Sequence, residues 1–246
     1  MKILLTVSYD GTAYCGWQRQ ENGVTVQQVL EYALSKLYAR QITILGASRT
    51  DAGVHALGQR AVFSLCNNDF KIPLDKLPCA VNSALPDDIA VSCAEEASED
   101  FHPIYCAKAK TYEYRIYNSV FMNPLVRNYY FQIRHKLDFD AMRQACESFI
   151  GEHDFAGFCS VKSKVKTTIR TIHNLSLSRD GDEIIITING NGFLYNMVRI
   201  VVGTLIAVGE GKINQADIPA IIASKRRKSA GKTAPPHGLS LLSVEY

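Results

Sequence analysis

Several features that would place a protein in a particular class are missing from this chain. It has no apolar run near the ~18 residues that a membrane-spanning helix needs, and none of the usual N-terminal targeting features. We therefore expect a cytoplasmic protein. No Walker loop, G-x-G-x-x-G or H-E-x-x-H pattern is present, so the common nucleotide and metal signatures are excluded. The sequence thus predicts no cofactor.

Cysteine is not scarce, but its spacing argues against two kinds of framework. The seven cysteines stand singly, and no C-x-x-C pair occurs. An odd, dispersed set favours reduced, mostly buried thiols over a disulfide framework or a zinc site. We expect no bound metal, and a chemistry that side chains carry alone.

Charge is unevenly divided along the chain. Residues 1–104 contain 8 Lys and Arg against 12 Asp and Glu, a balance of −4, and residues 105–246 contain 19 against 12, a balance of +7. Together they give the formal net charge of +3. A basic second half indicates an anionic partner such as nucleic acid. A solvated basic face with no partner is an equal alternative on charge alone.

Hydrophobic spacing and turn residues predict a mixture of strands and helices. Apolar residues at helical spacing predict amphipathic helices, and β-rich or alternating runs predict strands. Asp180-Gly181 is a hairpin signal between two of the strands. The expected strands are 3–9, 42–45, 59–65, 91–97, 111–117, 169–177, 183–189 and 239–246, and the expected helices are 26–38, 74–84, 138–150, 193–209 and 215–227.

The order of these elements favours an α+β fold. Strands and helices mix without a regular βαβ alternation, and the second half repeats the rhythm of the first. We expect two related halves, residues 1–104 and 105–246, that form an extended, mostly antiparallel sheet. The helices are expected on one side of this sheet, with a central cleft between the halves.

The segment GASRTDAGVHA, residues 46–56, is the candidate active-site loop. It is expected between two strands, and its small residues would let a large planar substrate approach the backbone. Arg49 and His55 flank Asp51, and a nearby cation keeps an aspartate ionised and available as a nucleophile. On the residues alone, a turn stabilised by an Arg49–Asp51 pair is the commoner arrangement, and His55 is expected to structure the loop.

Blocks of sequence, in order along nearly the whole chain, resemble one enzyme family. GASRTDAGVHALGQ is similar to the active-site loop of the TruA family of tRNA pseudouridine synthases, and YDGTAYCGWQRQ resembles the opening motif of that family. The likeness continues in VQQVLEYAL, VNSALPDDIAV, KTYEYRIYN, FLYNMVRIVVGTL and APPHGLSL. The resemblance implies the pseudouridine synthase fold and the isomerisation of uridine to pseudouridine in tRNA.

By this resemblance, three residues carry the chemistry. Asp51 takes the position of the catalytic aspartate, as nucleophile. Tyr112 takes that of a tyrosine that stacks on the base, where stacking is worth ~1–3 kcal/mol; the alternative is that Tyr112 and Tyr114 are ordinary strand residues, one on each side. Arg199 takes that of an arginine paired with the aspartate. Its guanidinium, inside an apolar helix, needs an anion or else a path to solvent.

Further residues are assigned to substrate binding. Arg49 matches a family position implicated in displacing the flipped nucleotide, and Leu239 is assigned to the apolar floor under the uracil, although the core is its default place. The family's F-H-A-R stretch is here FHPI, residues 101–104, without its arginine. Basic residues outside the motifs are interpreted as RNA phosphate contacts, with a solvated helix end as the alternative for the tail: Lys162, Lys164, Lys166, Arg170 and the tail 225–228.

The resemblance also implies a target and an assembly. TruA-like enzymes modify uridines at positions 38, 39 and 40 in the anticodon arm of tRNA, and they act as homodimers that grip one tRNA across both subunits. A target base in a folded stem must be flipped into the pocket. Recognition through shape and phosphates would suit an enzyme that accepts several adjacent positions.

Three other functions fit parts of the pattern. A catalytically inactive RNA-binding module is expected to lack Asp51, Tyr112 or Arg199, and no RNP-type motif is present. A glycosidic hydrolase needs a second carboxylate, and the loop has only one. A synthase of the same chemistry that acts on small nuclear or messenger RNA stays open.

Overall fold

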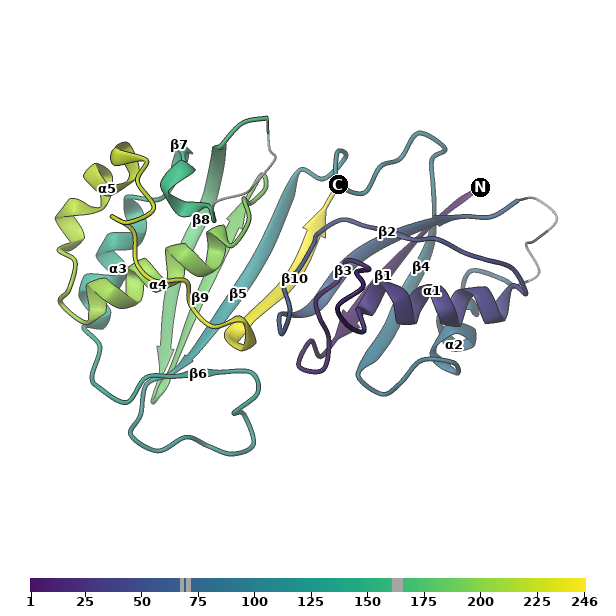
Figure 1. Ribbon diagram of the computed structural model, residues 1–246, viewed down its shortest axis with the longest axis horizontal. Helices are drawn as coiled ribbons and strands as arrows, with labels where there is room; N and C mark the ends of the chain where they lie inside the picture. Colours follow the sequence, from purple (N-terminus) through teal and green to yellow (C-terminus); the bar gives the residue numbers. More distant parts are fainter. Residues whose placement is uncertain (67–68, 70–71, 161–165) are drawn as a thin grey trace. The chain divides into compact units, whose positions relative to one another are not determined.

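The computed structural model describes residues 1–66, 69, 72–160 and 166–246 of the chain. It divides into two compact units (Figure 1): unit 1 is Met1–Lys108 with Ser240–Tyr246, and unit 2 is Ala109–Leu239. Each unit combines a mostly antiparallel sheet with helices, so the predicted α+β class is confirmed. The boundary predicted at residues 104 and 105 and the central cleft stay predictions.

Unit 1 contains a sheet in the order β4-β1-β3-β10, with β2 beside β3. Its neighbouring strands pair antiparallel, except that β10 runs parallel to β3, with Ser240 opposite His55. The last strand of the chain therefore lies beside the strand that follows the Asp51 loop. The strands are β1 (Lys2–Tyr9), β2 (Leu45–Gly46), β3 (His55–Ser64), β4 (Ile89–Ala97) and β10 (Leu239–Glu245).

One face of the unit 1 sheet is buried, as the alternation in β1 predicts. The side chains of Ile3, Leu5 and Val7 are fully buried, and they share a face because successive residues of a strand point to opposite sides. Helix α1 (Val26–Leu37) begins after the N-cap residue Thr25, and its apolar side is buried. The shorter helix α2 (Leu77–Asn82) contacts α1 and β4.

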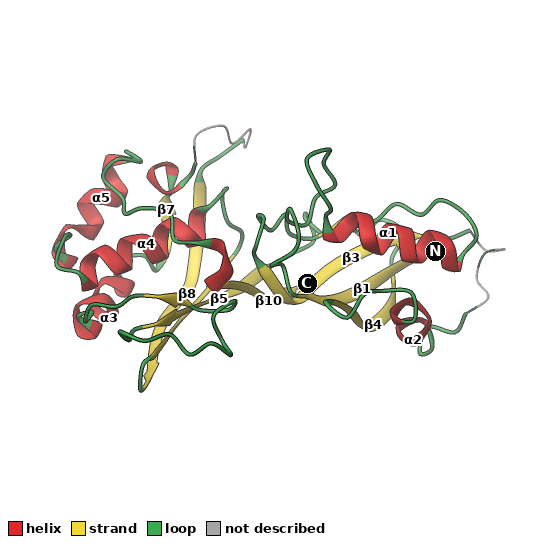
Figure 2. Ribbon diagram, turned by 60° about the horizontal axis from the view of Figure 1, so that its bottom comes forward, coloured by secondary structure: helices red, strands yellow, loops and turns green. Residues whose placement is uncertain are grey.

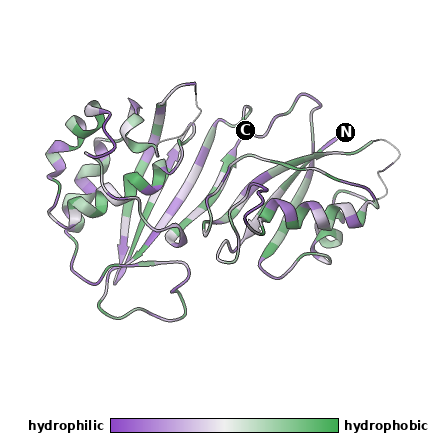
Figure 3. Cartoon of the chain, viewed as in Figure 1, coloured by the Kyte–Doolittle hydropathy of each residue, from purple (hydrophilic) through white to green (hydrophobic). Residues whose placement is uncertain are grey.

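Unit 2 contains a sheet in the order β5-β9-β8-β7, with β6 beside β5. Its helices gather on one side of these strands (Figure 2), and α4 is buried along nearly its whole length, in keeping with its mainly hydrophobic colouring in Figure 3. The strands are β5 (Ala109–Tyr117), β6 (Phe131–Gln132), β7 (Gly151–Asp154), β8 (Ile169–Asp180) and β9 (Glu183–Gly190). The helices are α3 (Phe139–Glu147), α4 (Met197–Gly209) and α5 (Ile218–Ser224), with short 3-10 turns at Ala156–Phe158, Gln215–Asp217 and Pro236–Gly238.

Two expected elements differ from the structure for reasons visible in their backbone. The strand expected at 42–45 is confined to Leu45–Gly46, because the Ile42 N–H donates to Ser35 Oγ and the Ile44 N–H to Glu31 Oε1, both on α1. The helix expected from 193 begins at Met197, because Asn196 adopts a left-handed conformation (φ 61°, ψ 7°). The hairpin between β8 and β9 is confirmed.

The cysteines are free thiols, as expected, but their burial differs from the prediction. Among the seven, Cys146 and Cys159 are buried, whereas Cys66, Cys79, Cys93 and Cys106 are exposed. The prediction of mostly buried thiols is therefore wrong. These cysteines lie at positions that face solvent. Cys93, for example, is an exposed residue of β4 and lies opposite Thr6 of β1.

Membrane crossing and metal binding can be judged directly for the described residues. None of their helices combines the length and the apolar character that a bilayer crossing requires. No group of three or more His, Cys, Asp or Glu side chains among them is arranged to hold a metal ion.

Helix α4 meets the segment 231–234 backbone to backbone. A Cβ added to Gly203 would lie 1.7 Å from the carbonyl oxygen of Lys232. We expect Gly203→Ala to lower the free energy of unfolding by about 1–3 kcal/mol, because the segment must move away. Urea denaturation followed by circular dichroism measures this change.

The control for this variant is Gly192→Ala, whose added Cβ would lie 3.8 Å from Arg170 Nε, an ordinary contact. We expect its stability to stay near that of the wild type. Alanine is otherwise the better helix former, so a Gly203→Ala protein more stable than the wild type would contradict the close approach.

Candidate active site

The Asp51 loop, residues 46–54, is hydrogen-bonded to the segment 9–17 on both sides of Asp51. The Thr50 hydroxyl lies 2.7 Å from the Tyr9 hydroxyl, and the Thr50 carbonyl accepts from the Trp17 N–H (3.1 Å). On the other side, the Gly53 N–H donates to the Tyr14 carbonyl (3.3 Å). These bonds satisfy backbone groups of the loop and hold Asp51 between two fixed neighbours.

Two glycines in the opening block make this approach possible. A Cβ on Gly11 would lie 2.0 Å from the Val54 carbonyl oxygen, and one on Gly16, where φ is +88°, would lie 2.6 Å from the Thr50 carbonyl oxygen. Any side chain at either position would push the two backbones apart. The opening block and the loop block are therefore one packed arrangement.

Two buried polar side chains complete the frame. Gln59 is 0% exposed; its Oε1 accepts from the Ser48 N–H (3.1 Å) and its Nε2 donates to the Ser48 carbonyl (2.7 Å), as a neighbouring strand would. His55 Nδ1 accepts from the Gly11 N–H (3.0 Å) and lies 3.1 Å from Asp10 Oδ1. His55 structures the loop, as expected.

Asp51 is half-buried at the turn of the loop. Its carbonyl accepts from the Val54 N–H (3.1 Å), which closes the turn. Arg49 is exposed, and in the described part of the chain it makes no ion pair with Asp51. The shape of the loop therefore comes from backbone packing and from Gln59, and not from the pair that is commoner on the residues alone.

Tyr112 lies on the inner, helix-covered face of β5 in unit 2. It is 7% exposed, and its ring meets Phe193 edge-on, with centroids 5.3 Å apart. Tyr114 is buried on the same face, and its hydroxyl donates to the Pro235 carbonyl (2.9 Å). The alternative arrangement, with one tyrosine on each side of the sheet, is wrong, because residues two apart in a strand share a face.

Arg199 lies in the first turn of α4, and its half-buried guanidinium is held inside unit 2. Nε donates to the Ala234 carbonyl (2.7 Å), and Nη1 donates to Asn196 Oδ1 (2.9 Å). Burial raises the pKa of Tyr114, and the charge of Arg199 opposes that rise, so the two groups lie within electrostatic reach. The guanidinium is thus anchored by hydrogen bonds.

Lys110 is a residue that the sequence analysis did not single out. It precedes Tyr112 by two positions and therefore lies on the same face of β5. Burial, with a smaller contribution from the charge of Arg170, lowers the pKa of Lys110 to about 8. The signal that could have revealed it is the alternation itself, which puts Lys110 in phase with buried Tyr112 and Tyr114.

The remaining assigned residues have different surroundings. Leu239 is 5% exposed at the start of β10. Lys166 is exposed, whereas Arg170 is half-buried and donates from Nη1 to the carbonyls of Thr167 and Ile169. Lys162 and Lys164 lie outside the described residues.

Part of the basic tail 225–228 serves the fold. Lys225 Nζ pairs with Asp154 Oδ2 (2.7 Å), and this pairing contributes to a lowered pKa of Asp154. Arg227 Nη1 donates to the Gly231 carbonyl (2.8 Å). These two residues make contacts within the chain, and phosphate binding by the tail stays a prediction.

Comparison with known proteins identifies the family of this arrangement. The profile of a family described as tRNA pseudouridine synthase matches residues 5–106 and 145–246. The chain belongs to this family. The tRNA pseudouridine synthase A of Caldicellulosiruptor bescii is 51% identical over 244 residues, and those of Acetivibrio thermocellus and Geotalea daltonii are 49% and 44% identical; each comparison covers 99% of both chains.

The resemblance seen in the sequence blocks is thereby confirmed, together with the fold and the reaction. The enzyme is an isomerase that converts uridine to pseudouridine in tRNA. The matched ranges include Asp51, Arg199 and Leu239, whereas Lys110 and Tyr112 fall between them. The roles of the individual residues stay predictions.

The Gln59 side chain should matter for stability and activity together. The substitution Gln59→Leu removes the two hydrogen bonds between this side chain and the buried Ser48 backbone. We therefore expect the free energy of unfolding to fall by about 1–3 kcal/mol. Because that peptide leads into Asp51, kcat should fall as well. Urea denaturation and a turnover assay measure the two effects.

Gln28→Leu is the matched control, since Gln28 is an exposed residue of α1. It should leave both quantities nearly unchanged. A Gln59→Leu enzyme with wild-type stability and wild-type kcat would show that the loop holds its shape without Gln59.

The lowered pKa of Lys110 predicts a pH dependence of stability. Its pKa is about 8 in the folded protein against 10.5 ordinarily. The unfolded chain therefore binds more protons between these values, and this residue makes stability rise with pH from about 8 to about 10. In Lys110→Met that rise should be reduced, as measured by urea unfolding at a series of pH values.

Lys108→Met is the control, because Lys108 is exposed and lies outside the buried face. It should keep the wild-type pH dependence. An unchanged slope in Lys110→Met would mean that Lys110 is solvated in the folded protein.

Proposed function

We propose that the enzyme acts on uridines at positions 38, 39 and 40 in the anticodon arm of tRNA, with Asp51 as the nucleophile. The observation that carries this proposal is the frame around Asp51, in which Thr50 and Gly53 are hydrogen-bonded on either side of a half-buried carboxylate. A nucleophile is most effective when it is held in one orientation beside the reacting bond. A rigid loop supplies that orientation.

The reaction needs few groups. The bond between N1 and C1′ breaks, the uracil turns, and a bond forms between C5 and C1′; the C5 proton leaves and N1 gains one. Asp51 begins this by adding to the sugar, by adding to the base, or by promoting loss of the C2′ proton. No water is added across the glycosidic bond, so the second carboxylate of a hydrolase is not required.

Arg199, Tyr112 and Leu239 are proposed to complete the site. Arg199 is a positioned cation, and Asp51 is its proposed partner, because a nearby positive charge favours an ionised carboxylate. Tyr112, whose ring is braced edge-on by Phe193, is proposed to stack on the flipped base. Leu239 is proposed to form the apolar floor under the uracil.

Binding of the RNA is proposed to depend on shape and on phosphate contacts. Lys166 and Arg170 are the proposed contacts among the described residues, alongside Lys162 and Lys164. Arg49 is exposed two positions before Asp51, where it can displace the flipped nucleotide. The resemblance to TruA-like enzymes supports a cytoplasmic homodimer that grips one tRNA and uses no cofactor.

Transcripts of tRNA with tritium at uridine C5 test the target and the nucleophile together. The wild type should release tritium to water, and carbodiimide mapping should locate pseudouridine at positions 38 to 40. Asp51→Asn keeps the size of the side chain but removes its charge, so we expect turnover to be abolished while tRNA binding in a filter assay persists.

The control is Asp87→Asn, since Asp87 is an exposed carboxylate of the same unit. It should turn over at the wild-type rate. If no tRNA with uridine at positions 38 to 40 releases tritium, the proposed target is wrong. Tritium release from small nuclear or messenger RNA instead would favour the remaining alternative, a synthase that acts on those RNAs. Collapse of binding with surviving turnover in Asp51→Asn would make Asp51 a structural residue.

A further inference from the structure

Asn196 precedes α4 in a conformation that few residues adopt. Its φ of 61° lies in the left-handed region, which asparagine tolerates better than most side chains. An asparagine at this position usually caps the helix by accepting a bond from one of its first amides. Here the side chain makes no such capping bond. It is directed to two other side chains.

The two contacts of Asn196 connect Ser160 to Arg199. Asn196 Nδ2 lies 2.8 Å from Ser160 Oγ, and Asn196 Oδ1 lies 2.9 Å from Arg199 Nη1. The orientation of the amide follows from chemistry: a guanidinium can only donate, so the oxygen must face Arg199 and the nitrogen must face Ser160. The amide is therefore held in one orientation by both neighbours.

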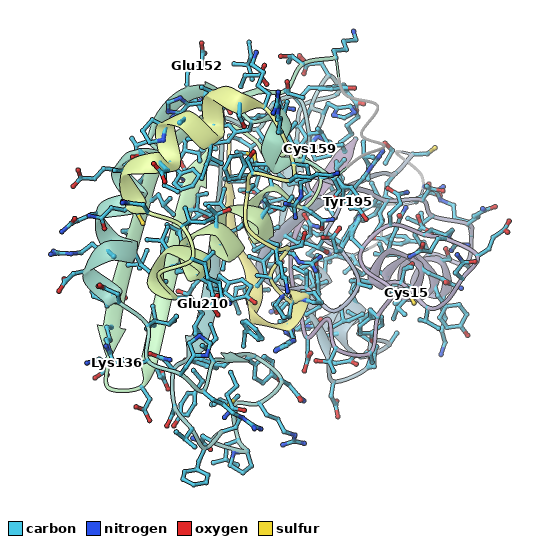
Figure 4. All side chains as sticks on the ribbon, turned by 60° about the vertical axis from the view of Figure 1, so that its left-hand side comes forward. Cys15, Lys136, Glu152, Cys159, Tyr195 and Glu210 are labelled. Carbon is cyan, nitrogen blue, oxygen red and sulfur yellow. The ribbon has the colours of Figure 1, made fainter. Side chains whose placement is uncertain are left out.

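Ser160 is itself fixed to the start of α4. Its N–H donates to the Tyr195 carbonyl (3.1 Å), so backbone and side chain of Ser160 bind adjacent residues. Figure 4 labels Cys159 and Tyr195, which precede Ser160 and Asn196 in the chain. The amide of Asn196 thus belongs to a small hydrogen-bonded chain that runs from Ser160 to Arg199.

Two hydrogen bonds on different nitrogens act on the orientation of the Arg199 guanidinium. Nε is bound to the Ala234 carbonyl and Nη1 to Asn196 Oδ1. A guanidinium is planar and rigid, so two bonds on different nitrogens set both its plane and the direction of its third nitrogen.

We propose that Asn196 is a positioning residue, which sets the plane of the Arg199 guanidinium while Ser160 holds Asn196. This inference rests on the proposed role of Arg199 as the partner of the catalytic carboxylate. It assigns to Asn196 no contact with the reacting atoms. Its effect on the reaction passes through Arg199, and this makes it testable by a double-mutant cycle.

The principal variant is Asn196→Gly, because glycine adopts the left-handed conformation without strain and removes both side-chain bonds. In single-turnover tritium release with excess enzyme, we expect its rate to fall about 10-fold or more, as for the loss of a hydrogen bond to a charged group. The KM for tRNA in steady-state assays should change less than about 2-fold, because the Asn196 side chain is hydrogen-bonded to Arg199 and not to the residues proposed to bind phosphates.

The second substitution of the cycle is Arg199→Lys. It keeps the positive charge, but the ammonium group of lysine is not planar, so Asn196 cannot set its orientation in the same way. In that background Asn196→Gly should change the rate by less than about 2-fold. Ala39→Gly is the matched control: Ala39 also has a positive φ (51°) and lies in unit 1, so glycine there should leave the rate unchanged.

Ser160→Ala keeps the test decisive if Asn196→Gly does not fold. It removes one hydroxyl and should lower the rate in the wild-type background but not in the Arg199→Lys background. The proposal is overturned if Asn196→Gly and Ser160→Ala both react at the wild-type rate. It is also overturned if either substitution lowers the rate by the same factor in the Arg199→Lys background as in the wild type. A wild-type rate in Arg199→Lys alone would instead count against the proposed role of Arg199.

Discussion

The contact between segment 9–17 and the Asp51 loop is the constraint on which the arrangement of unit 1 depends. Because Gly11 and Gly16 carry no side chains, two backbones meet directly and bind through N–H and carbonyl groups. The sheet brings them together: β1 ends at Tyr9, which pairs with Ala56 near the start of β3. The position of Asp51 is thus a consequence of strand register and not of the loop sequence alone.

In unit 2, as in unit 1, a glycine allows two backbone segments to pack in direct contact. Gly203 lets α4 and the segment 231–234 meet at backbone distance, and this brings the Ala234 carbonyl to Arg199 Nε. A guanidinium in an apolar helix is costly unless its donors are satisfied. The Ala234 carbonyl and the Asn196 amide are neutral acceptors, so they satisfy donors of the group without cancelling its charge. Close backbone packing therefore fixes the backbone on both sides of Asp51 in unit 1, and it brings a carbonyl acceptor to the Arg199 side chain in unit 2.

Local patterns predict those elements whose signals are local. Periodicity predicts α1 to within one residue of its observed end, and Asp180-Gly181 predicts the β8–β9 hairpin. The extended residues 42–44 cannot be predicted in this way, because their amides bind side chains of α1. The start of α4 depends on the backbone of Asn196, whose side chain is directed to Ser160, 36 residues away. Periodicity carries no information about such distant partners.

The candidate site shows the same limit. A single carboxylate close to an arginine gives the same local sequence pattern in an ordinary turn and in an active site. Only the resemblance to the family therefore singles out Asp51 in the sequence. In the described part of the chain, Arg49 does not form the expected turn pair with Asp51.

Lys110 illustrates what the fold adds. A cation whose pKa is lowered to about 8 by burial and by Arg170 costs stability. Lys110 shares a face of β5 with Tyr112, which is proposed to stack on the base. Part of the excess positive charge of the second half therefore lies on a half-buried residue, two positions from the tyrosine proposed to bind the base.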